Sequence, residues 1–273
     1  MTIVIEPRGA VARSVGRNVR DWIPAVAVFV LGILAWEGAI AAFHIQRFLL
    51  PRPTSIVHTF FSQRSILWGA GWYTFKEALG GFVLGSGSGI LFALLLARFR
   101  RLGNALMPIA IAANAIPIIA FAPIFGAWFD PLSPNSKIAV AAVLCFFPVM
   151  VNTLRGLTAV RPASIELMRS YAAGERQIFR RVRIPTALPY TFSALKVASV
   201  LAMIGAIVGE YFGGSQEALG IQIKNSAALF NFETAWAAIM VASILGIAFY
   251  STVALLERIT LRWDPTRQER GTA

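Results

Sequence analysis

A small set of ionisable residues lies inside long apolar stretches of the sequence, namely Glu37, Glu77, Lys196 and Glu210. Charge at membrane depth is costly, so such residues are candidates for a solute pathway or a gate. Glu210 is the stronger candidate of the two carboxylates near the outer ends of their stretches. The candidate pathway or gating residues are Glu210 and Glu37, together with Asn114 and Pro117 in the proline-containing stretch 104–129.

The position of Lys196 favours a different interpretation. It lies near one end of its apolar stretch, from which a long ammonium-bearing side chain can reach water by snorkelling. Along one helix, Lys196 and Glu210 are separated by about 21 Å at a rise of 1.5 Å per residue. We therefore expect no direct pairing between them within one helix, and the sequence shows no carboxylate pair near the middle of a span.

Residues that could form an enzyme active site or a metal site are sparse. The chain has two histidines, His44 and His58, and a single cysteine, Cys145, in an apolar run. These supply neither a nucleophile with its base nor a cluster of metal ligands. The glycine-rich stretch 80–89 lacks the Gly-Lys-Ser/Thr ending of a phosphate-binding loop. We expect a chain that is not an enzyme and binds no cofactor or metal of its own.

The composition predicts the helices that position these residues. Of 273 residues, 57% are hydrophobic and 14% are charged, with a mean hydropathy of +0.66. Soluble domains are about 45–50% apolar, so we predict an all-α integral membrane protein. A helix crosses a bilayer with about 20 apolar residues. About six stretches qualify: Trp22–Phe43, Tyr73–Ala97, Asn104–Phe129, Ser136–Leu154, Leu188–Phe212 and Thr234–Leu256.

The net charge of +12 comes from arginines that alternate with these stretches. Arginines are dense before the first, between the second and third, between the fourth and fifth, and after the sixth. An excess of basic residues marks the cytoplasmic side, so both termini are predicted to be cytoplasmic. A nucleic-acid binder would gather its arginines in one patch instead. The expected divisions are a cytoplasmic segment 1–21, a transmembrane domain 22–257 and a cytoplasmic tail 258–273.

Glycines and prolines add detail to the second and third stretches. Gly81, Gly85 and Gly89 recur every fourth residue, which places them on one helical stripe and lets a neighbouring helix approach closely. Pro108, Pro117 and Pro123 interrupt the third stretch. Because proline removes a backbone hydrogen bond, this span is predicted to be kinked, for packing or for lining a pathway.

The longest cytoplasmic loop, 155–187, has the pattern of a short amphipathic helix. Ser164 is expected to cap it, and apolar residues recur along one face at Ile165, Met168, Ala172 and Ala173. Gly174 is expected to break the helix. A partly apolar face rimmed by arginine is suited to a protein partner or the lipid headgroup layer.

This loop resembles that of binding-protein-dependent ABC importer permeases, whose pattern is Glu-Ala-Ala, three residues, Gly, nine residues and Ile-x-Leu-Pro. Glu166 stands at the glutamate and Ala172 at the glycine, with Gly174 two places on. The resemblance implies that the loop couples the permease to an ATPase. The implied coupling residues are Glu166, Leu167, Met168, Ala172, Gly174, Val182, Ile184 and Pro185.

The resemblance extends over about 74–229 and is to the nitrate, sulfonate and taurine branch. Around 130–137 and 166–189 the sequence is most similar to permeases for riboflavin or for pyrimidine precursors of thiamine. The positions that carry the wider resemblance are Gly81-Phe82, Gly85, Gly89, Pro117, Ala122-Pro123, Trp128-Phe129, Lys137, Phe147-Pro148, Asn152-Thr153, Gly156 and 205–214.

What this resemblance implies is a permease subunit in a bacterial-type inner membrane. It would pair with a second permease copy, a dimer of cytoplasmic ATPases that use ATP-Mg, and an extracytoplasmic binding protein that delivers the solute. Sulfonate, taurine or nitrate is the alternative solute class. An ion-gradient-driven secondary transporter is the alternative of another class, although such folds usually show internal repeats and paired acidic residues.

Overall fold

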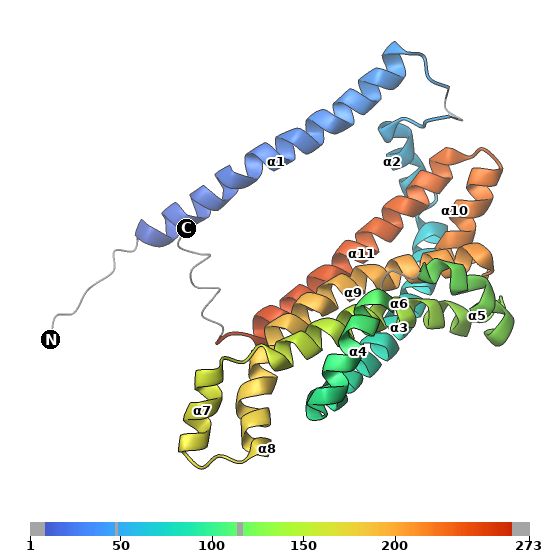
Figure 1. The fold of residues 1–273 in the computed structure, drawn as a ribbon. Helices are drawn as coiled ribbons and strands as arrows, with labels where there is room; N and C mark the ends of the chain where they lie inside the picture. The colour runs from blue at the N-terminus through green and yellow to red at the C-terminus, as the bar shows by residue number, and fades with distance from the viewer. Residues whose placement is uncertain (1–8, 47–48, 114–116, 264–273) are drawn as a thin grey trace.

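The computed structural model describes residues 9–46, 49–113 and 117–263, and these form helices without any strand (Figure 1). This confirms the predicted all-α fold. Long apolar helices that could each cross a membrane dominate the described part of the chain. They are α1 (Gly9–Ala42), α3 (Arg64–Arg98), α6 (Pro134–Thr158), α9 (Ile184–Phe212) and α11 (Phe232–Thr260).

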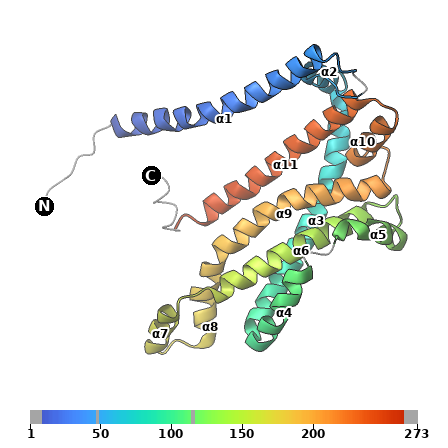
Figure 2. The same cartoon turned by 45° about the horizontal axis from the view of Figure 1, so that its top comes forward.

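Shorter elements cover the two ends of this bundle. At one end, arginines close α3, α6 and α11 and fill the loop between α6 and α9; we call this the arginine-rich end. α7 and α8 lie there, whereas α5 and α10 lie at the opposite end (Figures 1 and 2). The short elements are α2 (Pro53–Ser62), α4 (Arg100–Ala113), the 3₁₀ turn η1 (Ile118–Phe121), α5 (Ala122–Phe129), α7 (Pro162–Ser170), α8 (Glu175–Ile178), the π-helical turn η2 (Phe179–Arg183) and α10 (Leu219–Ala228).

The expected third span, 104–129, is not one continuous helix. Its described residues form α4, η1 and α5 in succession, and α4 and α5 lie toward opposite ends of the bundle (Figure 2). Pro117 stands directly before η1, and Pro123 occupies the first turn of α5, where a missing N–H costs nothing. The prolines therefore divide this segment rather than bend a single helix.

The core is formed by α3, α6 and α9, which all contact one another, and small residues set the spacing between α6 and its neighbours. A Cβ atom added to Gly81 would lie 2.3 Å from the Ala141 Cβ, and one added to Gly85 would lie 2.1 Å from the Ala142 carbonyl oxygen. Gly89 meets the Phe146 carbonyl oxygen at 2.7 Å in the same way. The predicted glycine stripe is confirmed as the surface on which α6 packs against α3.

A matched pair of glycines on α3 tests this packing. Gly85→Ala should destabilise the protein by about 1–3 kcal/mol, because the new methyl overlaps the α6 backbone and forces the helices apart. At Gly87 no atom lies within 4 Å of the place that a Cβ would take, so Gly87→Ala should leave stability unchanged or raise it slightly. Thermal unfolding of both variants in mild detergent measures the difference. Equal melting temperatures would contradict the close contact of α3 with α6.

Most of α1 stands away from the other helices (Figures 1 and 2). Its side chains from Ile23 to Leu34 are largely exposed. The helix is held near its C-terminal end, where the Trp36 ring packs edge-on against Trp236 of α11 with centroids 5.2 Å apart. Ile40 is buried close by. The first expected span therefore exists as a helix, but it adds little to the core.

Candidate functional site

The expected loop helix is present as α7. It begins after Arg161 with Pro162 in its first turn, so Ser164 lies inside the helix and does not cap it. It ends at Ser170, which leaves Ala172 and Ala173 outside the helix. The predicted apolar stripe is therefore shorter than expected and includes Ile165 and Met168, which are half-buried.

The chain turns at Ala172, not at Gly174. Ala172 has φ 56°, in the left-handed region, whereas Gly174 has φ −72° and ψ 161°, an ordinary extended conformation. The turn is closed by hydrogen bonds from the Ala172 N–H to the Arg169 carbonyl (2.9 Å) and from the Ala173 N–H to the Met168 carbonyl (3.0 Å). The prediction that Gly174 breaks the helix was wrong. Position 172 is where the resembled pattern has glycine, the residue that adopts this conformation without a steric penalty.

A second matched pair of variants follows from this geometry. Ala172→Gly should stabilise the loop by about 1 kcal/mol, because it removes the steric cost of a left-handed alanine. Gly174→Ala should change stability by less than about 0.5 kcal/mol, since the backbone conformation there suits alanine and no atom lies within 4 Å of its Cβ position. Amide hydrogen exchange over 168–178 reports loop opening directly. Slower exchange in Gly174→Ala than in Ala172→Gly would contradict the assignment of the strained residue.

The outer face of α7 carries two large exposed apolar side chains. Leu167 is 59% exposed and Tyr171, directly after the helix, is 77% exposed. They are four residues apart and so lie on one face. Tyr171 was not among the residues singled out from the sequence, although its spacing from Leu167 could have found it. We call Leu167 and Tyr171 the α7 apolar tip.

The other face of α7 borders an open cavity of about 980 Å³ at the arginine-rich end. Met107 of α4 and Leu157 of α6 line its apolar part, and Glu166, Arg169 and Arg183 supply charge. Arg169 also forms an ion pair with Glu175 at 2.8 Å, across the Ala172 turn. Both of these side chains are exposed, so the pair adds little to stability.

The closing residues of the loop pattern join it to α9. Val182 lies in η2, and Ile184 and Pro185 form the first turn of α9. Phe179 and Ile184 pack against a buried cluster from α3, α4 and α6. Next to this cluster, a Cβ added to Gly156 would lie 2.8 Å from the Ala187 Cα. The end of α6 is therefore in close contact with the start of α9. The loop is thus continuous with a core helix through packed residues.

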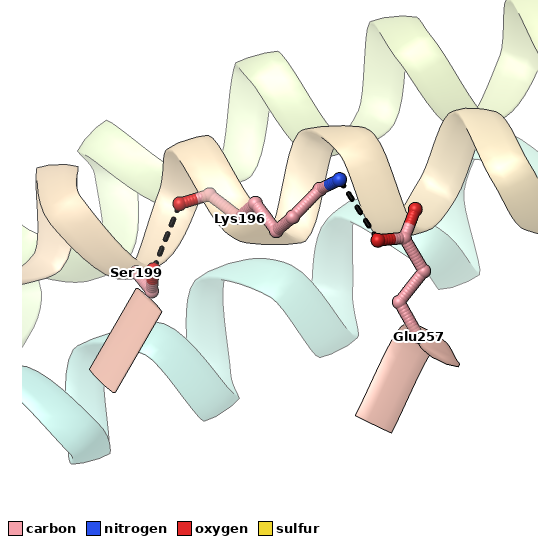
Figure 3. Close-up of polar contacts among 3 residues, drawn as sticks. All are labelled: Lys196, Ser199 and Glu257. Carbon is pink, nitrogen blue, oxygen red and sulfur yellow. Dashed lines mark hydrogen bonds and ion pairs between the residues drawn. The ribbon is translucent and has the colours of Figure 1, made fainter. Parts of the chain in front are cut away.

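Lys196 of α9 forms an ion pair with Glu257 of α11, and the atoms Nζ and Oε2 are 2.8 Å apart (Figure 3). The side chains are only 21% and 9% exposed. The same stretch of α9 also holds Ser199, whose hydroxyl donates to the Lys196 carbonyl at 2.8 Å. This partner of Lys196 was not foreseen from the sequence, and snorkelling of Lys196 to water stays a prediction. Glu257 was missed because it falls one residue beyond the predicted sixth span.

Glu37 has a structural partner at the opposite end of the bundle. Its carboxylate accepts hydrogen bonds from the Thr54 hydroxyl (2.9 Å) and the Thr54 N–H (3.3 Å). Thr54 lies in the first turn of α2, so Glu37 satisfies a free N–H and places negative charge at a helix N-terminus. The contact ties α1 to α2. A pathway role for Glu37 stays a prediction.

Glu210 lies in a buried polar cluster near the opposite end. It is fully buried, together with Glu77 of α3 and Lys137 of α6. The carboxyl groups come from α3 and α9, which both meet the first turn of α10 here, an arrangement that no sequence pattern indicated. Pro117 is exposed before η1, and Asn114 lies outside the described residues. Among the described candidates, Glu37 is bonded to α2, Glu210 is bonded to α10 and Pro117 is exposed.

Comparisons with known proteins agree with this arrangement. A family model described as "Binding-protein-dependent transport system inner membrane component" matches residues 85–261. The formylaminopyrimidine transport permease protein of Halalkalibacterium halodurans is 37% identical over 237 residues, which are 86% of this chain and 93% of that relative. The riboflavin transport system permease protein of Chloroflexus aurantiacus is 31% identical over 249 residues, or 89% and 92% of the two chains.

A solved structure is also similar. The inward-facing MetNI methionine ABC transporter matches with a TM-score of 0.51 and 18% sequence identity, over 77% of this chain and 98% of that chain. At this identity the likeness concerns the fold alone. It supports an arrangement of helices shared with an ABC transporter.

Proposed function

We propose that this chain, which belongs to the family of binding-protein-dependent transport system inner membrane components, translocates a pyrimidine precursor of thiamine. The chain is a permease component of an ABC importer and a transport subunit rather than an enzyme. Its family is one of multi-pass proteins of the inner membrane. We propose in addition which solute the chain carries and which surfaces contact its partners.

The observation that carries the proposed solute is the 37% identity to the formylaminopyrimidine permease, which extends over most of both chains. Riboflavin is the second candidate, because the riboflavin permease is 31% identical over a similar length. Both named solutes contain a nitrogen heterocycle. In the proposed system a binding protein outside the membrane selects the solute and delivers it to the permease.

The proposed partner at the arginine-rich end is a dimer of cytoplasmic ATPases, which would bind and hydrolyse ATP-Mg. The excess of basic residues supports a cytoplasmic location for this end and for both termini. The α7 apolar tip supports docking in a groove, since a helix with exposed apolar side chains is suited to a hydrophobic groove on a partner. A second copy of the permease would complete the transporter.

The coupling residues act in this proposal through the path from α7 to α9. Movement of α7 would reach the membrane helices through η2, because Phe179 and Ile184 pack against the core next to α9. Packed helices shift between discrete arrangements as rigid bodies. Ala172 sets the turn between α7 and α8, and Val182, Ile184 and Pro185 join the loop to α9.

Two steps test the proposal. A mild-detergent pull-down of the tagged chain from its native membrane, followed by mass spectrometry, identifies the ATPase and binding protein. The purified complex is then placed in proteoliposomes and given labelled formylaminopyrimidine, riboflavin, an aliphatic sulfonate or nitrate. We expect uptake of the pyrimidine that requires the binding protein and hydrolysable ATP.

Other results would revise the proposal in distinct ways. Uptake of sulfonate or nitrate in place of the heterocycles would contradict the solute and leave the importer intact. Uptake by the chain alone that stops when an ionophore collapses the ion gradient, and that needs no ATP, would contradict coupling to an ATPase.

A further inference from the structure

Three charged side chains from three helices meet inside the bundle near the opposite end. Glu77 of α3 is 3% exposed, Lys137 of α6 is 1% exposed and Glu210 of α9 is fully buried. Ionised groups are costly in such surroundings unless they are paired and hydrogen-bonded. Two carboxyl groups and one ammonium group would leave one unbalanced negative charge if all three were ionised.

Glu210 has the partners that an ionised carboxylate needs. Its Oε2 atom accepts a hydrogen bond of 2.7 Å from the N–H of Gly220, in the first turn of α10. The adjacent N–H, of Leu219, donates to the Thr74 hydroxyl at 3.0 Å. The positive end of the α10 dipole therefore points at Glu210 and favours its charged form. Gly220 permits the contact, since a Cβ there would lie 2.8 Å from Oε2.

Lys137 balances the charge of Glu210 without donating to it. Its Nζ atom donates to the Pro131 carbonyl and, at 3.0 Å, to the Ser133 carbonyl. These carbonyls belong to the turn that precedes α6, and Ser133 caps that helix. The ammonium group is thus held in place by the backbone and supplies one positive charge to the cluster.

The remaining carboxylate oxygens lack donors. Among the described residues, no donor reaches Oε1 of Glu210 or either oxygen of Glu77, although all three atoms are buried. Two adjacent N–H groups of α10 bring the carboxyl groups together: Leu219 donates to Thr74, one turn before Glu77 on the same face of α3, and Gly220 donates to Glu210. Two ionised carboxylates in this position would both be acceptors and would repel. One hydrogen between them would satisfy both groups.

We propose that Glu77 and Glu210 form a proton-binding site, in which a protonated Glu77 donates a hydrogen bond to Oε1 of ionised Glu210. The proton belongs to Glu77 because Glu210 has the backbone donor and the helix dipole, whereas Glu77 has neither. The cluster then carries one negative charge on Glu210 and one positive charge on Lys137, and is neutral overall. The bound proton links α3 to α9 and α10.

The other groups around Glu77 are consistent with this assignment. On its own helix, Lys76 lies over the ring of Tyr73, with Nζ 5.6 Å from the centroid. α11 faces the same part of α3 with Phe249, which packs edge-on against Phe75 and Phe82. The charged groups from neighbouring helices that act on Glu77 are Glu210 and Lys137. Asp130, before α6, acts on Lys137.

Infrared spectroscopy of the full chain in dodecyl maltoside, a detergent that contains no carbonyl group, tests the site. A protonated carboxylic acid has a C=O stretching band that ionised carboxylates lack. At neutral pH, where exposed acids are ionised, the wild-type protein should show one such band from a buried group. The band should disappear in Glu77→Gln. Absence of the band from the wild type, or its survival in Glu77→Gln, would overturn the proposal.

The two glutamates should also differ in their tolerance of substitution. Glu77→Gln keeps a donor for Glu210 and should melt near the wild-type temperature, while Glu77→Leu removes the donor and should melt lower. Glu210→Gln removes the countercharge of Lys137 and should melt lower or fail to fold. If the Glu210→Gln variant fails to fold, the infrared spectra of the wild type and of Glu77→Gln still show whether Glu77 is protonated. A melting temperature that rises with added Na⁺ in the wild type and not in Glu77→Gln would overturn the proposal in favour of a bound cation.

Discussion

Replacing Leu167 and Tyr171 together with aspartate should reduce ATP-driven uptake by about 100-fold or more, if each side chain is a hot spot of at least 2 kcal/mol. The α7 apolar tip would be buried in a groove of the ATPase, and a carboxylate there would lose its water without a partner. The measurement is solute uptake by proteoliposomes that contain the complete transporter. Co-purification of the ATPase with the tagged permease should be lost in parallel.

The same double variant should fold normally, because α7 contains no buried residue. Its elution from a size-exclusion column and its melting temperature should match those of the wild type. Leu167→Met and Tyr171→Phe keep the apolar area, so they serve as matched controls and should retain uptake. Full uptake by the aspartate variant, with the ATPase still bound, would show that docking takes place elsewhere.

Breaking the ion pair between Lys196 and Glu257 on one side should destabilise the protein by about 3 kcal/mol. Lys196→Met leaves the Glu257 carboxylate without the ammonium 2.8 Å away, and Glu257→Gln leaves the ammonium without its countercharge. Both groups are mostly buried, so water compensates little. Thermal or denaturant unfolding in detergent measures the loss. Uptake should also fall, since the pair joins α9, which continues from the coupling loop, to α11.

The double variant Lys196→Met/Glu257→Met separates pairing from packing. Replacing both partners with apolar residues removes two buried charges at once and should restore most of the stability. Ser199→Ala is the matched control, because it removes a hydrogen bond beside the pair without changing charge and should cost little (Figure 3). Additive losses in the double variant would mean that the two charges do not interact.

Local properties of the sequence predicted the expected spans except the third, 104–129, which is divided into α4, η1 and α5. Length and hydropathy predicted five stretches that are long apolar helices in the structure. The four-residue spacing of Gly81, Gly85 and Gly89 predicted a close helix contact, because that spacing places side chains on one face whatever the helix packs against. The resemblance of the loop and of the residues around it to binding-protein-dependent permeases indicated the family, to which the chain belongs.

The local conformation of the loop was predicted only in part. Its position between α6 and α9 and the existence of α7 were correct. The turn was placed at Gly174 because glycine favours left-handed backbone, but the hydrogen bonds that close α7 require that conformation at Ala172. The surrounding contacts outweigh a conformational preference of about 1 kcal/mol.

Pairing between helices was decided by the tertiary structure alone. Lys196 and Glu257 are 61 residues apart, and nothing in the spacing of either helix indicates that the two meet. Glu77 and Glu210 were each recognised as costly charges in a membrane, yet their proximity depends on how α3, α6 and α9 pack together. Hydropathy and helical period are properties of one segment, so the sequence by itself determined the spans and their faces. The partner of a buried charge depends on the relative rotation and height of two helices, which only the packed bundle sets.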